Sequence, residues 1–196
     1  MRTNFFDSNN YFIDEKVNFL KFENSYQVYN NKGDKIGAVK QKLTFKQKML
    51  RLLFKKQMLP FLLDIVNINN ELVASVSRGW TFFMSRITIQ DAHGSKIGTI
   101  QQKFKVFKPT FKIFNSSEIL IAEINGDWKA WNFTITDSSN VQIGTISKKW
   151  AGAMQEIFTS ADKYNVTIDS NYSNKDNKIV ILAGAITIDM VLKEFK

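Results

Sequence analysis

The chain has 196 residues, with 27 Lys or Arg against 18 Asp or Glu, so its formal net charge is +9 with the single histidine neutral. Hydrophobic residues make up 44% and charged residues 23%, which is typical of a globular domain and not of a disordered chain. The absence of cysteine excludes disulfide scaffolds, cysteine–zinc sites, thiol nucleophiles and iron–sulfur clusters. A single histidine excludes metal sites of two or three histidines and catalysis by paired histidines.

A repeated β-hairpin pattern runs through most of the chain. Each copy has an alternating strand, a turn rich in Asn, Asp, Gly or Ser, and a second alternating strand. Three copies, at 26–39, 87–100 and 133–146, carry a glycine after an isoleucine in the return strand. A glycine inside a strand indicates a bulge or the close approach of another backbone. These glycines are Gly37, Gly98 and Gly144.

A second hairpin type alternates with the first. It turns at Asn69-Asn70 and again at Ser116-Ser117. Strands at a spacing of roughly 8–12 residues predict a β-sandwich or a closed barrel. The alternating segment 164–168 predicts one further strand, whereas 150–160 fits a helix or a strand.

Two segments interrupt the β pattern. Lys46 to Leu59 is rich in strong helix formers and predicts a short basic helix. Ile179 to Leu192 is the longest apolar stretch, and as a helix of about 21 Å it is too short for a hydrocarbon core of roughly 30 Å. We therefore expect no transmembrane span. An apolar helix must be buried on every side. A barrel that encloses the helix would bury it and would fill its own interior at the same time.

The C-terminal part of the chain carries a distinctive motif. It runs from Ser147-Lys148-Lys149-Trp150 through Gln155-Glu156-Ile157-Phe158-Thr159 to an apolar segment with Ile188-Asp189. These residues resemble the phospholipid scramblase family, and the hairpins upstream extend the resemblance to roughly 11–196. The resemblance implies a mainly β, tubby-like fold: a closed 12-stranded β-barrel around a buried hydrophobic C-terminal α-helix. The resemblance further implies a single domain over 11–196 after an N-terminal tail over 1–10.

The resemblance also implies a calcium segment at 160–171. Its only carboxylates are Asp162 and Asp169, the candidate metal ligands. Calcium usually takes six to eight oxygen ligands, several of them carboxylates, so we expect no appreciable calcium binding. The chain also lacks the proline-rich tail and cysteine cluster of vertebrate members. A relative that has this fold but no scrambling activity is therefore an alternative.

A basic cluster is the main candidate for a ligand surface. The stretch from Lys35 to Leu63 has no acidic residue. On the predicted helix, a basic face with apolar residues behind it could lie on an anionic membrane surface, and the alternative is a helix packed on the barrel with a solvated basic face. The candidate lipid-binding residues are Lys46, Lys48, Arg51, Lys55 and Lys56.

Three functions follow from these patterns. The resemblance implies a non-enzymatic, phospholipid-related protein that is cytoplasmic and peripheral at the inner membrane surface. A soluble protein-interaction or scaffold module with the same fold is the first alternative. The second is a nucleic-acid-binding barrel, because lysines and phenylalanines interleave between Ala92 and Ser117. That interleaving equally fits barrel strands with phenylalanine inward and lysine outward.

Overall fold

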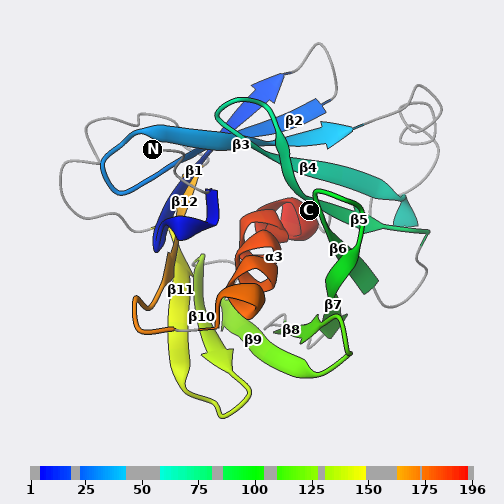
Figure 1. The fold of residues 1–196 in the computed structure, drawn as a ribbon, viewed down its shortest axis with the longest axis vertical. Coiled ribbons are helices and arrows are strands. Elements are labelled where there is room, and N and C mark those ends of the chain that lie inside the picture. The colour runs from blue at the N-terminus through cyan, green and yellow to red at the C-terminus, as the bar shows by residue number, and fades with distance from the viewer. Residues whose placement is uncertain are drawn as a thin grey trace.

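The computed structural model of the chain describes residues 5–18, 23–42, 58–80, 86–103, 110–127, 131–148, 163–172 and 174–193. Twelve antiparallel strands form a closed barrel in which each strand pairs with its neighbours in sequence, and β12 pairs with β1 to close the ring. One 19-residue helix, α3 (Lys175–Lys193), lies inside the ring of strands (Figure 1). The tubby-like architecture implied by the resemblance is confirmed.

The strands are short and of similar length. They are β1 (Asn10–Asn18), β2 (Glu23–Tyr29), β3 (Lys35–Lys42), β4 (Phe61–Asn67), β5 (Leu72–Arg78), β6 (Arg86–Asp91), β7 (Lys96–Lys103), β8 (Thr110–Asn115), β9 (Leu120–Asp127), β10 (Asn132–Asp137), β11 (Gln142–Ser147) and β12 (Lys163–Ile168). A 3-10 helix, η1 (Phe5–Asp7), precedes them.

Alternation along the strands separates the core from the solvent. In β8, Phe111 and Ile113 are buried, while Lys112 between them pairs with Glu123 of β9 at 2.8 Å. The Lys112 ammonium donates a hydrogen bond that holds the pKa of the Glu123 carboxyl below its ordinary value. The expected arrangement of phenylalanine inward and lysine outward is therefore confirmed for this part of the strand.

The turns of the five hairpins have the same geometry. The prediction of two hairpin types is therefore wrong for the turns themselves. In each turn the side-chain oxygen of the first residue accepts hydrogen bonds from the backbone N–H groups two and four residues later, at 2.8–3.0 Å. Asparagine and aspartate close turns in this local way. The fourth residue of each turn has positive φ. The first residues are Asn30, Asn67, Asp91, Asn115 and Asp137.

A bulge follows every turn, in the return strand. The strand register shifts at an aliphatic residue, after which comes glycine in β3, β7 and β11 but alanine in β5 and β9. A Cβ atom added to Gly98 would lie 2.6 Å from the Phe114 carbonyl oxygen and would also overlap the Val180 side chain of α3. The predicted bulge and the predicted close approach thus occur together, and this difference between glycine and alanine separates the two sequence patterns.

Helix α3 enters the barrel behind a capping residue. The Asn174 side chain accepts a hydrogen bond from the Asn177 N–H at 3.0 Å, as an N-cap does. Residues 180–188 are buried, and the Tyr164 hydroxyl of β12 donates to the Ile186 carbonyl inside the barrel. Within the described ranges, no helix combines the length and the apolar character needed to cross a membrane.

The N-terminal segment closes part of one mouth of the barrel. Phe5 and Phe6 of η1 belong to the core, although they lie in the stretch 1–10 for which the resemblance implies a tail. The Tyr11 hydroxyl donates to the Ser8 carbonyl at 2.7 Å and to the Phe5 carbonyl at 3.2 Å. Burial raises the pKa of Tyr11 well above its ordinary value. These contacts attach the segment to β1.

Candidate functional site

The barrel has two ends of different construction. The five hairpin turns and the 169–174 connection into α3 lie at one end, which we call the turn end. The antiparallel order places the other strand ends at the opposite end, the loop end. Helix α3 joins the two, because Val180 lies against Gly98 near the turn end and Ile186 contacts Tyr164 near the loop end.

Charge differs sharply between the two ends. At the turn end, the chain segments between strands, together with the 169–174 connection into α3, contain one basic and four acidic residues. The segments that join strands at the loop end contain eleven basic and two acidic residues. They also contain most of the chain's phenylalanine and tryptophan, whereas Tyr172 is the one aromatic residue between elements at the turn end. The basic surplus of the sequence therefore falls in the segments that join strands at the loop end, most of whose residues lie outside the described ranges.

Described side chains at the loop end show how cations are placed there. Lys42, the last residue of β3, pairs with Asp64 of β4 at 2.5 Å while 63% of its side chain stays exposed. Lys148 lies over the Trp131 ring at 4.6 Å from the ring centroid, a cation–π contact. Trp80, just after β5, is 51% exposed.

One cation at this end is buried. Arg78, the last residue of β5, is only 3% exposed. Its Nη2 atom donates to the Leu59 carbonyl at 2.8 Å, and its guanidinium lies 4.7 Å from the centroid of the Phe61 ring. Burial of a charge is costly unless hydrogen bonds and aromatic contacts compensate for it, so these contacts hold Arg78 in the barrel wall.

Sequence reasoning missed this buried polar position. Arg78, Gln41 and Gln102 all follow the bulge residue of their strand by five positions and are all buried. Aligning the hairpins on their turns shows that a polar residue recurs at this position, but the burial of Arg78 depends on contacts from elsewhere in the chain. Three strands thus carry a buried polar residue near the loop end, where apolar side chains such as Phe61 and Trp131 are also buried.

The five candidate lipid-binding residues, Lys46, Lys48, Arg51, Lys55 and Lys56, lie outside the described residues, as does the predicted helix apart from its last two residues. The strands that flank them are described: β3 ends at Lys42 and β4 begins at Phe61, both at the loop end. The undecided segment 150–160 also falls outside the described residues.

The candidate metal ligands are not brought together in the described part of the chain. Asp162 lies outside it. Asp169 begins the connection into α3, and its carboxylate accepts a hydrogen bond from the Asn171 N–H at 2.8 Å. Across the described ranges, no group of three or more His, Asp or Glu residues is placed to hold a metal ion.

Comparison with known proteins agrees with this architecture. The family model described as Scramblase matches residues 13–194. This chain belongs to the scramblase family. Its relatives include a phospholipid scramblase family protein of Schizosaccharomyces pombe, 22% identical over 90% of this chain and 50% of that protein. Human phospholipid scramblase family member 5 is 26% identical over 76% of this chain and 58% of that protein.

A third relative is a yeast protein with a different kind of name. Altered inheritance rate of mitochondria protein 25 of Saccharomyces cerevisiae is 22% identical over 87% of this chain and 65% of that protein. The present chain therefore spans between half and two-thirds of the length of these curated relatives. No solved structure matches the chain.

Proposed function

We propose that this scramblase-family chain is a non-enzymatic protein that binds the anionic phospholipid surface of the cytoplasmic leaflet through the loop end of its barrel. The residues that would make the contact are Lys46, Lys48, Arg51, Lys55 and Lys56. Two of its relatives are named for the phospholipid scramblase family, but the segment 160–171 of this chain has only two carboxylates, so we propose lipid binding and not scrambling.

The segregation of charge between the two ends supports this proposal. A cation near an anionic lipid surface contributes about 1 kcal/mol, so several cations at one end give useful affinity where the same number spread evenly would not. Phenylalanine and tryptophan add apolar area that can enter the headgroup region. The acidic turn end, by contrast, would be repelled by the same membrane.

Vesicle co-sedimentation tests the proposal. We expect the chain to bind vesicles of phosphatidylcholine with phosphatidylserine, not pure phosphatidylcholine, and to bind less as salt shortens the screening length. The combined substitution Lys48→Glu, Arg51→Glu and Lys55→Glu should weaken binding by about 100-fold or more, since each site changes from attraction to repulsion.

A matched control separates position from net charge. Lys32, Lys35 and Lys40 are exposed residues of the β2–β3 hairpin. Their combined substitution with glutamate changes the net charge by the same amount as the loop-end variant and should leave most of the binding intact. Equal losses in the two variants, or equal binding to neutral and anionic vesicles, would contradict the proposal.

The nucleic-acid alternative has its own measurement. A single-stranded oligonucleotide titrated into the protein should show weak binding. Tight binding with a steep dependence on salt would instead favour the nucleic-acid function.

A further inference from the structure

The turn end holds a surface that the membrane proposal does not use. An open groove of about 660 Å³ lies between the β4–β5, β6–β7 and β8–β9 turns and the first turns of α3. Its apolar lining includes Phe6 of η1, Val73 and Ile97 of the bulges, and Ile179 and Val180 of α3. Elsewhere at this mouth η1 packs into the core, so the groove is the part that the N-terminal segment leaves open.

Exposed aliphatic side chains occur in the hairpins that form this groove. Leu72, the first residue of β5, lines it and is 37% exposed, and Ile68 in the turn before β5 is 54% exposed. Ile119 follows Glu118 in the β8–β9 turn, which contributes Ser116 to the lining, and is 60% exposed. Exposed aliphatic residues around a concave apolar surface are typical of an interaction site. Most of the exposed large hydrophobic residues in the described ranges thus gather at the end of the barrel that faces away from the proposed membrane contact.

The two charged residues among the described lining of the groove are acidic. Asp91 and Asp176 line it, and none of its described lining residues is Lys or Arg. Asp176 is exposed in the first turn of α3. An anionic lipid surface would be repelled here, whereas a cationic group would be attracted.

We infer that the groove binds a peptide segment of a partner protein that combines aliphatic anchors with basic side chains. The aliphatic anchors would contact Val73, Ile97 and Ile179, and the basic groups would face Asp91 and Asp176. This inference goes beyond the proposed function and does not depend on it. It makes the barrel a two-ended adaptor, with lipid at the loop end and protein at the turn end.

Two serines at the same turn position provide a test and its control. Ser116 lines the groove, and Ser138 is the corresponding residue of the β10–β11 turn, outside the groove lining. Both are exposed, so Ser116→Arg and Ser138→Arg should leave the unfolding midpoint unchanged. Ser116→Arg adds bulk and a positive charge to the groove, and Ser138→Arg adds them elsewhere.

The probe is a short fluorescein-labelled peptide with leucines and arginines in a glycine–serine background, followed by fluorescence anisotropy. We expect the wild type and Ser138→Arg to bind it equally and Ser116→Arg to bind at least about tenfold more weakly. A peptide with glutamates in place of the arginines should not bind. Equal binding by the two variants, or equal binding of the two peptides, would overturn the inference.

Two further measurements separate the other occupants of the groove. Ser116→Arg should bind phosphatidylserine vesicles as the wild type does, and a loss there would assign the groove to the membrane and overturn the inference. Sedimentation velocity should show the same mass for the wild type and Ser116→Arg. Self-association of the wild type that disappears in Ser116→Arg would assign the groove to a second copy of the chain, which would equally overturn it.

Discussion

The turn end and the loop end belong to the same twelve strands but are built in opposite ways. At the turn end, five connections repeat one hydrogen-bonded turn, with an Asn or Asp oxygen at 2.8–3.0 Å from two backbone N–H groups. At the loop end, the connections differ in length, from the short segment 19–22 to the long segment 43–60. They share no sequence pattern. The connections at the acidic turn end thus have one geometry, and those at the basic loop end vary.

This difference suggests a division of labour. Each tight turn sets the register of its hairpin, so the turns determine how the strands of the barrel pair. Connections that need not set register can vary in length and carry function. Loss of stability should therefore follow substitutions at the turn end, and loss of membrane binding should follow substitutions at the loop end.

The largest expected effect comes from removing the element that joins the two ends. Deletion of residues 179–196 takes Val180, Ile181, Leu182, Ile186 and Ile188 from the core. Each large buried side chain contributes about 1.5–3 kcal/mol, so their sum is comparable with the net stability of about 5–15 kcal/mol for a whole domain. We expect insoluble protein without cooperative unfolding by circular dichroism. A soluble truncation with a cooperative transition would refute this role of α3.

The next effect compares one glycine at each end. Gly98→Ala should lower the free energy of unfolding by about 2–3 kcal/mol, because the new Cβ would meet both a backbone carbonyl and α3. Gly79, after β5 at the loop end, has no atom of the described residues beyond its chain neighbours within 4 Å of the corresponding Cβ position. Gly79→Ala should therefore leave stability unchanged or raise it by up to about 1 kcal/mol. Urea unfolding measures the free energy of unfolding of both variants. Equal changes in the two variants would contradict the predicted difference between the two ends.

A smaller effect isolates the turn chemistry. Asp137 accepts hydrogen bonds from the Ser139 and Val141 N–H groups at 2.8 and 2.9 Å. Asp137→Ala loses both and should cost about 1–2 kcal/mol in the free energy of unfolding. Asp137→Asn should change it by less than about 0.5 kcal/mol, because asparagine begins three of the other turns. A large loss in Asp137→Asn would show that charge, not geometry, matters at this position.

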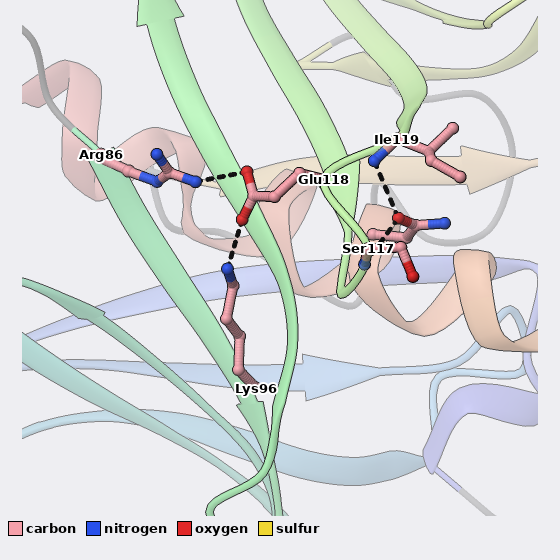
Figure 2. A network of polar contacts seen from close by, with 6 residues as sticks. Arg86, Lys96, Ser117, Glu118 and Ile119 are labelled. Carbon is pink, nitrogen blue, oxygen red and sulfur yellow. Dashed lines mark hydrogen bonds and ion pairs between the residues drawn. The ribbon is translucent and has the colours of Figure 1, made fainter.

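The smallest effect depends on pH. Glu118 bridges Lys96 and Arg86, the first residues of β7 and β6 (Figure 2). The hydrogen bond from Lys96, with a further contribution from Arg86, lowers the pKa of the Glu118 carboxyl below its ordinary value. A lowered folded-state pKa means that this carboxylate stabilises the fold above its unfolded pKa of about 4.3.

That contribution is lost as pH falls through the lowered folded-state pKa. The difference in unfolding free energy between the wild type and Glu118→Gln should therefore be constant above about pH 5 and shrink below about pH 4.3. Added salt should reduce the difference, because the groups are exposed. Urea unfolding from pH 3 to pH 7 measures it, and a difference that grows toward low pH would contradict the assignment.

Much of the fold can be predicted from the sequence, for identifiable reasons. The hairpins are visible because the alternation of β2 and β3, and of the later pairs, is local in sequence. The bulges at Gly37, Gly98 and Gly144 are visible because glycine inside a strand usually marks a bulge or a close backbone approach. The burial of Arg78 is not visible, because its compensating contacts with Leu59 and Phe61 come from another part of the chain.

The turns, the strand alternation and the apolar C-terminal helix follow from the amino-acid sequence alone, because each depends on residues within a few positions of one another. The closure of the ring through β1 and β12, and the meeting of distant connections at one end, emerge only when the chain is folded. The same holds for Ser116, which lines a groove while the equivalent Ser138 does not. The closure of the barrel and the surroundings of each turn depend on contacts between distant segments. Turns with the same local geometry therefore have different surroundings, because α3 enters the barrel beside only some of them.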